Sequence, residues 1–326
     1  MYYLGELTHA RAHLEQCIVL CASQKRSVRA TGDPGVISRS YAANVLWYLG
    51  YPDQALKRSQ EALILARELS HPFSLAWALD TAAYLYQLRR EGWAVRERVE
   101  TLIALCSEQG FAQWLAEGSI LRSWALAEQG QREDGIAQIH QDLAAWQAIG
   151  AELERPYWLA LLAETCGKAG QAEEGLSALA EALALVEKNG DRVYEAELYR
   201  LKGTLTLQQA NQKSKGKSQK AKIETDPRSL IPDPQFEAEA CFFKAIEIAR
   251  KQQAKSWELR AVMSLVRLRQ QQAMQPVSRT TQHEAHSMLD EARTMLSEVY
   301  NWFTEGFDTK DLQEAKALLE SLESGV

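Results

Sequence analysis

The chain has 326 residues, 46% of them hydrophobic, and a formal net charge of −6. This composition is ample for a buried core, and the modest negative charge argues against a dedicated nucleic-acid-binding protein, which is usually basic. Five cysteines, an odd number scattered among helical patterns, favour reduced thiols in a cytoplasmic protein over a disulfide framework. The first residues lack a basic region with a long apolar core, so no signal peptide is expected. No uncharged apolar run approaches the ~20 residues of a membrane-spanning helix.

Glycine recurs with a 40-residue period in two interleaved phases. One phase holds Gly50, Gly130 and Gly170, with Arg90 in the vacant position, and the other holds Gly110, Gly150 and Gly190, with Ser70 in the vacant position. Self-similarity at such a period indicates a repeat array. Because glycine commonly ends helices, two stops per period predict two helices per repeat. The sequence therefore predicts an all-α, right-handed α-solenoid of about six helical hairpins, a fold whose usual task is to hold another molecule.

The array is expected to begin with an incomplete repeat. Glu6–Leu20 resembles the second helix of a hairpin, and residues 1–35 are interpreted as this partial repeat and a linker. Regular hairpins follow over residues 36–210. Their helices are predicted at Val36–Gly50 with Asp53–Leu69, from Pro72 onward with Trp93–Gln109, at Ala112–Gln129 with Glu133–Ile149, at Pro156–Ala169 with Ala172–Asn189, and at Asp191–Ala210.

The rhythm breaks in residues 211–235. This segment holds five lysines and three prolines, which predicts an exposed insertion that buries little. The helical pattern resumes at Phe236, displaced by one period plus 23 residues. The last repeats occupy residues 236–308, with a sixth hairpin at Ser256–Gln272 and His283–Val299, and residues 309–326 are expected to form a cap helix near Thr309–Leu322. All of these segments belong to one array over residues 1–326.

Small residues recur at fixed positions inside each hairpin. Examples are Ala43, Ala83 and Ala163 at the eighth position and Ala55, Gly135 and Gly175 at the twentieth. This spacing resembles the tetratricopeptide repeat, lengthened from 34 residues to 40, and the small residues allow the two helices to approach closely. Ser123 and Asp142 depart from the pattern in the third hairpin, and Arg90 replaces a glycine.

Several strings carry a closer likeness. They include Gly50-Tyr-Pro-Asp-Gln-Ala-Leu, Trp124-Ala-Leu-Ala-Glu-Gln-Gly and Trp302-Phe-Thr-Glu-Gly-Phe-Asp. These strings are similar to the C-terminal repeat region of large bacterial signalling proteins that carry a class III adenylate or guanylate cyclase domain followed by a STAND-type ATPase. The resemblance implies that this chain is the sensor and scaffold part, without either catalytic part, and an enzyme is not expected.

Other candidate sites are weak. The nearest match to a phosphate-binding loop, Gly216-Lys217-Ser218, lies in the lysine-rich insertion without a preceding strand and is interpreted as a solvated loop. The lysines of that insertion could contact phosphate or anionic lipid, but no aromatic residues are interleaved for stacking. His9, His13, Cys17 and Cys21 share one helical stripe, and four ligands spread over three turns cannot converge on one ion. We therefore expect no metal and no cofactor.

The tetratricopeptide resemblance also implies a binding surface, since the first helices of such arrays line a concave groove. Mapping that face onto this chain gives the expected partner-binding residues Trp77, Tyr84, Trp124, Tyr157, Arg200, Arg260 and Arg267. The groove would be aromatic in its N-terminal half and basic toward its C-terminal end. Aromatic residues and arginine are the usual hot spots of protein interfaces.

The expected partner is a protein or peptide with acidic groups, such as a cyclase or ATPase domain of the same signalling assembly. Nucleic acid and membrane insertion are not expected. The carboxylate clamp of chaperone-binding relatives is not reproduced, because Ser40 stands where its first lysine would be. The alternative function is that of an effector-sensing repeat domain of a STAND-type regulator, with a small molecule as its ligand.

Overall fold

The computed structural model describes residues 1–23, 31–217, 233–274 and 282–323. Fourteen α-helices and no β-strand form the regular structure of these residues, which confirms the predicted all-α class. In chain order the helices are α1 (Leu7–Ser23), α2 (Pro34–Tyr48), α3 (Pro52–Leu69), α4 (Pro72–Leu88), α5 (Gly92–Gln109), α6 (Ala112–Glu128), α7 (Arg132–Ala148), α8 (Arg155–Ala169), α9 (Ala172–Asn189), α10 (Glu195–Lys217), α11 (Pro234–Gln252), α12 (Lys255–Met274), α13 (Gln282–Trp302) and α14 (Lys310–Glu323).

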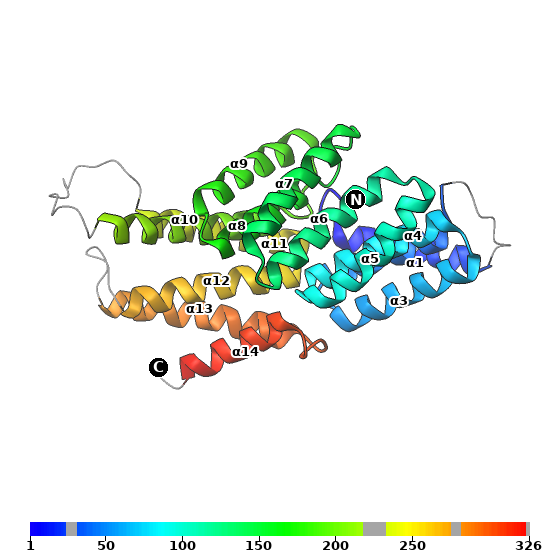
Figure 1. Ribbon diagram of the computed structural model, residues 1–326. Helices are drawn as coiled ribbons and strands as arrows, with labels where there is room; N and C mark the ends of the chain where they lie inside the picture. The colour runs from blue at the N-terminus through cyan, green and yellow to red at the C-terminus, as the bar shows by residue number, and fades with distance from the viewer. Residues whose placement is uncertain (24–30, 218–232, 275–281, 324–326) are drawn as a thin grey trace.

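The helices form an array of hairpins. The pairs are α2/α3, α4/α5, α6/α7, α8/α9, α10/α11 and α12/α13, with α1 packed on α2 and α14 packed on α12 and α13. The first helices of the hairpins contact one another in chain order and form an inner layer of α2, α4, α6, α8, α10 and α12. The last of them, α12, also contacts α2 (Figure 1). The array therefore turns far enough for the two ends of its inner layer to meet.

The helices end where the 40-residue period places glycine. All six glycines of the two phases have left-handed backbone conformations. Ser70 (φ 51°) and Arg90 (φ 63°) adopt the same conformation in the two positions that lack glycine, although it costs a residue with a side chain about 1–2 kcal/mol. Gln253 (φ 57°) does so at the equivalent of Gly190 beyond the insertion. The position in the repeat sets the turn, and glycine is its usual occupant.

Close approach of the paired helices explains the recurring small residues. A Cβ atom on Gly175 of α9 would lie 3.1 Å from the carbonyl oxygen of Ala163 in α8. One hairpin later, a Cβ atom on Gly203 of α10 would lie 2.9 Å from the carbonyl oxygen of Ala238 in α11. Both contacts are tighter than almost all Cβ contacts in proteins, so the close crossing of α8 with α9 recurs between α10 and α11, the two helices that flank the insertion.

Two departures from the repeat pattern compensate each other. Ser123 in α6 and Asp142 in α7 are both buried, and the Ser123 hydroxyl donates a hydrogen bond of 2.8 Å to the Asp142 carboxyl group. A buried polar group without a partner costs about 1–3 kcal/mol. The third hairpin thus replaces an apolar contact with a satisfied polar pair.

The insertion begins later than predicted. Helix α10 continues to Lys217, so the expectation of a loop from Asn211 is wrong for residues 211–217. Its side chains bond backward along the array, since Gln208 and Gln212 donate to the carbonyl oxygens of Gly167 and Gly170. The supposed phosphate-loop pair Gly216-Lys217 lies in the last turn of this helix. The exposed-loop prediction for residues 218–232 lies outside the described residues.

The C-terminal elements close the array on its N-terminal hairpin. Glu305 accepts hydrogen bonds of 3.0 Å from the backbone N–H groups of Asp53 and Gln54 and therefore caps the first turn of α3. The backbone N–H of Gly306 donates in return to the Asp53 carboxylate. Nearby, the rings of Trp302 and Tyr51 lie 5.4 Å apart. A carboxylate at a helix N-terminus accepts hydrogen bonds from the unpaired backbone N–H groups of the helix and interacts favourably with the helix dipole. Here the chain supplies that carboxylate from some 250 residues away.

Candidate functional site

A buried aromatic cluster lies among the inner helices. It comprises Trp47 and Tyr48 of α2, Tyr84 of α4, Tyr157 of α8, Tyr194 before α10 and Trp257 of α12. Neighbouring rings lie between 4.2 and 5.5 Å apart, and no member is more than 5% exposed. The cluster forms because closure of the array brings α12 against α2, and it leaves a pocket on either side.

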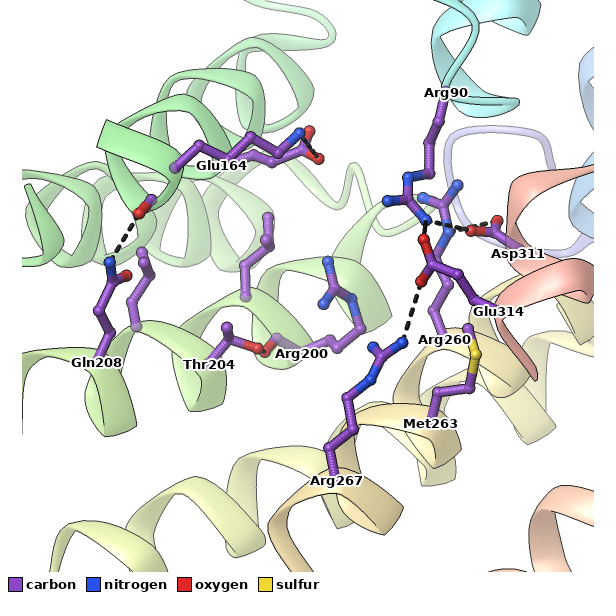
Figure 2. Close-up of a pocket in the computed structure, with 14 residues that line it drawn as sticks. Arg90, Glu164, Arg200, Thr204, Gln208, Arg260, Met263, Arg267, Asp311 and Glu314 are labelled. Atoms are coloured by element: carbon purple, nitrogen blue, oxygen red, sulfur yellow. Dashed lines mark hydrogen bonds and ion pairs between the residues drawn. The ribbon is translucent and has the colours of Figure 1, made fainter. Parts of the chain in front are cut away.

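The pocket toward the C-terminal half, which we call the arginine pocket, has a volume of about 290 Å³. Its basic lining residues are Arg90, Lys168, Arg200, Arg260 and Arg267, and its acidic lining residues are Glu164, Asp311 and Glu314. Figure 2 shows Arg90 and Arg267 reaching Glu314 from opposite sides, with nitrogen–oxygen distances of 2.7 and 3.0 Å. The pocket therefore joins the turn after α4, the inner helices α8, α10 and α12, and the cap helix α14.

Arg260 is the most enclosed of these arginines. Its Nε donates to Asp311 at 2.7 Å, and its Nη2 donates to the carbonyl oxygen of Leu88 at 2.6 Å. The guanidinium lies over the rings of Trp47 and Trp257, about 5 Å from each centroid. Although burial by itself would lower it, the Asp311 carboxylate raises the pKa of Arg260 above its ordinary value. This arginine fastens the cap helix and the α4 terminus to the aromatic cluster.

Lys168 and Glu164 form the opposite wall of the arginine pocket. The Lys168 ammonium donates to Glu164 at 2.8 Å and to Glu128 at 2.5 Å. Although burial would raise it, this lysine lowers the pKa of Glu164 to about 2. The other Glu164 oxygen accepts from the indole N–H of Trp124 at 3.3 Å. Each acid of this wall thus has a cation within reach.

The second pocket, on the N-terminal side of the aromatic cluster, is acidic and aromatic. Its volume is about 340 Å³. Its acidic lining residues are Asp80, Glu117 and Glu154, and its aromatic ones are Tyr3, Tyr41, Phe73, Trp77, Tyr84, Phe111 and Trp114. No lysine, arginine or histidine is among the described residues that line it. We call it the acidic pocket.

The predicted groove residues divide between these places. Arg200, Arg260 and Arg267 line the arginine pocket, and Trp77 and Tyr84 line the acidic pocket. Trp124 and Tyr157 line neither pocket and are almost completely buried.

The prediction that Tyr84, Trp124 and Tyr157 anchor a partner is therefore wrong, because these side chains are buried. Tyr157 stacks on Tyr84 and donates to the Gln87 side chain at 3.0 Å. The inner helices lie too close together to leave these rings exposed. Trp77 alone of the predicted aromatic residues keeps a partly exposed side chain in a pocket.

Sequence reasoning missed three of the acids that line the two pockets, Asp311, Glu314 and Glu154. Asp311 and Glu314 lie on the predicted cap helix, where no groove residue was expected. Arg90 stood out only as a missing glycine, although its left-handed backbone directs the side chain to Asp311 and Glu314. In the acidic pocket, Glu154 precedes α8 with φ +67° and accepts from the Tyr3 hydroxyl at 2.8 Å.

No protein-family model matches the sequence. An uncharacterized protein of Rhizobium meliloti (strain 1021), R02095, is 25% identical over 193 residues, which make up 59% of this chain and 19% of that protein. The chain thus matches about a fifth of the length of this relative. Among the described residues, no helix is long and apolar enough to cross a membrane, and no group of three metal-ligating side chains is present.

Solved structures that resemble this one are 13 to 14% identical to this chain in sequence. The apo form of RapI covers 89% of this chain and 97% of its own, with a TM-score of 0.49. For the TPR2AB-domain:pHSP90 complex of yeast Sti1, the match covers 88% of this chain and 98% of that chain, with a TM-score of 0.28. For the human IFIT1 dimer with m7Gppp-AAAA, it covers 98% of this chain and 82% of that chain, with a TM-score of 0.36.

Proposed function

We propose that the chain is a non-catalytic helical-repeat module that holds an acidic segment of a partner protein in the arginine pocket. One observation carries the proposal. Basic side chains from four separate elements converge there, and the cap helix α14 already places two carboxylates among them. A carboxylate-bearing segment of a partner would meet the same donors, and Arg–carboxylate pairs are among the stronger and more specific polar contacts.

The pocket has more basic than acidic lining residues, and two acids outside the lining, Glu128 and Glu197, pair with Lys168 and Arg200. Five basic and three acidic side chains line it, in a chain whose net charge is −6. Arg267 is about half exposed, with 47% of its side chain accessible. Arg200 bonds only an acid of its own helix, Glu197, through Nε and Nη2. An acidic segment would therefore engage Arg267 and Arg200 by replacing their internal partners Glu314 and Glu197.

A domain of a larger signalling assembly is the partner we favour. The sequence is similar to the repeat region that follows the cyclase and ATPase domains of bacterial signalling proteins. The relative R02095 also extends well beyond the matched region. An acidic segment of such a domain, released when an effector competes for the pocket, would give the repeat module a regulatory role.

The test is fluorescence anisotropy with a labelled, acidic Glu/Leu helical peptide as the probe. We expect saturable binding by the full chain, and Arg200→Glu with Arg267→Glu should weaken it by at least about tenfold, because each charged contact contributes about 1.5–3 kcal/mol. Rising salt should weaken the binding of the parent more than the residual binding of the variant.

Two controls make the test specific. A Lys/Leu peptide of the same length should not bind in the pocket. Arg67→Glu with Arg132→Glu, which changes the charge equally on the exposed faces of the outer helices α3 and α7, should leave binding of the acidic peptide almost unchanged. If the pocket variant and the outer-helix variant bind alike, the arginine pocket is not the docking site. Circular dichroism of both variants checks that helicity is retained.

A further inference from the structure

The acidic pocket contains carboxyl groups without a cation. Asp80 of α4, Glu117 of α6 and Glu154 before α8 come from three successive hairpins and line one enclosure. Burial, together with the neighbouring acids, raises the pKa of Asp80 and of Glu117 well above the usual value. This is the response of carboxyl groups that have lost water and gained no positive partner. In the arginine pocket, by contrast, every lining acid has a basic partner.

Two acceptors in the acidic pocket also lack donors. Asp80 is 9% exposed and Asn44 of α2 is 2% exposed, and the Oδ1 atom of each is buried without a hydrogen-bond partner among the described residues. The other two acids are better satisfied, since Glu117 accepts from Gln113 at 3.0 Å and Glu154 accepts from Tyr3 at 2.8 Å. Because buried polar groups in native proteins are almost always bonded, the side of the pocket formed by Asp80 and Asn44 needs a donor.

The rest of the wall is aromatic. The ring of Trp114 lies 4.5 Å from that of Phe73 and 5.6 Å from that of Trp77, and Trp77 lies 5.8 Å from Tyr41. Aromatic faces attract cations through their quadrupole and pack well against methylene chains. These rings give a ligand apolar contact area but no further charged partner.

We propose that the acidic pocket binds a linear organic amine with two or more ammonium groups. An ammonium group has three donors and no acceptor, which matches the open acceptors of Asp80 and Asn44. A second ammonium group would face Glu117 and Glu154, and the methylene chain between them would lie against Trp77 and its neighbours.

Other cations fit less well. A quaternary ammonium ion has no N–H donor for the open acceptors. A hard metal ion requires six or more oxygen ligands, which an aromatic wall does not supply. A diamine or polyamine uses both the acids and the rings. This site is separate from the arginine pocket and does not depend on the function proposed for it.

Isothermal titration calorimetry of the full chain tests the proposal, with spermidine and 1,5-diaminopentane as probes and pentane-1,5-diol as the uncharged counterpart. Both amines should bind with a stoichiometry near one and the diol should not. Asp80→Asn should weaken amine binding by at least about tenfold, the loss expected when a charged partner is removed. Glu314→Gln, in the arginine pocket, should leave amine binding within about twofold, since it lies outside the site.

A thermal-shift measurement guards against a folding defect. Asp80→Asn removes a buried acid while keeping its shape, so the ligand-free variant should melt no lower than the parent and should lose the increase that spermidine gives the parent. Equal heats for the amines and the diol would overturn the proposal. Unchanged spermidine binding in a folded Asp80→Asn variant would also overturn it. The same holds if magnesium chloride, at the ionic strength of the spermidine solution, abolishes spermidine binding.

Discussion

The two pockets lie on either side of one aromatic cluster, both take residues from the inner helices, and they handle charge in opposite ways. In the arginine pocket, acids of the cap helix neutralise arginines from the inner helices, and the buried ion pairs fasten the closed array. In the acidic pocket, three acids gather with aromatic rings, and no basic side chain is among the described residues that line it. Internal pairing in the first pocket also stabilises the fold, so that an acid of a partner would have to replace an internal one, while the second pocket keeps unsatisfied acceptors for a ligand.

The largest effect should come from removing the buried cation of the arginine pocket. Arg260→Ala leaves Asp311 with Arg90 as its remaining basic partner and removes the donor to the Leu88 carbonyl oxygen, and loss of one partner of a buried pair costs about 3–5 kcal/mol. Urea denaturation measures this loss. Arg267→Ala is the matched control, because its half-exposed pair with Glu314 contributes at most about 1 kcal/mol.

The combined variant Arg260→Met with Asp311→Leu sharpens the same measurement. It removes both charges and should recover much of the stability lost in Arg260→Ala. Similar losses in Arg260→Ala and Arg267→Ala would mean that closure does not depend on the buried pair.

Two glutamates should respond to pH with opposite signs. Burial raises the pKa of Glu154 in the acidic pocket to about 7, above its ordinary value of 4.5, despite the hydrogen bond from Tyr3. Its contribution to stability is complete below pH 4.5 and is lost as the pH rises through about 7. Glu164 has a pKa lowered to about 2 by Lys168, against the effect of burial, so its contribution is present above pH 4.5 and is lost as the pH falls toward 2.

Glutamine substitutions at these two positions should therefore separate the pockets. Above neutral pH, Glu154→Gln should be more stable than the parent and Glu164→Gln less stable, each by on the order of 1–3 kcal/mol. The stability difference between Glu154→Gln and the parent should shrink as the pH falls to 4.5, and the difference between Glu164→Gln and the parent should shrink as the pH falls to about 2. Denaturant titrations across this range measure them, and shifts of the same sign would contradict the contrast between the pockets.

The smallest effect concerns the two turns that lack glycine. Ser70→Gly relieves a left-handed backbone and removes only a weak hydroxyl contact to Arg67, so it should raise stability by about 1 kcal/mol. Arg90→Gly gives the same relief but removes the bonds to Asp311 and Glu314, so its net change should be near zero or unfavourable. Thermal unfolding of the two variants compares them, and an equal gain in both would show that Arg90 adds nothing to the arginine pocket.

Much of the array could be predicted from local patterns. The helix ends at Gly50, Gly110 and Gly170 follow from a conformation that glycine adopts without strain. The close approach at Gly175 follows from small residues at a fixed spacing. The continuation of α10 to Lys217 was missed, because lysine and glutamine are good helix formers and their polarity was read as a loop.

The site was predicted less well, for a reason that individual residues make clear. Arg200, Arg260 and Arg267 were assigned to one surface because they occupy equivalent positions on successive inner helices, and they do line one pocket. Tyr84, Trp124 and Tyr157 were assigned by the same rule and are buried. Position in the repeat gives the inward direction of a side chain but does not say what lies opposite it.

The sequence by itself determined the all-α class, the 40-residue unit, the positions of the helix ends and the faces that turn inward, because each depends on backbone conformation and on neighbours within one hairpin. Only the tertiary structure decided that α12 returns to α2 and that Asp311 meets Arg260. The turn of an array is the sum of small rotations between packed hairpins. Contacts such as those of Glu305 with α3 join residues some 250 positions apart, and no local pattern specifies them.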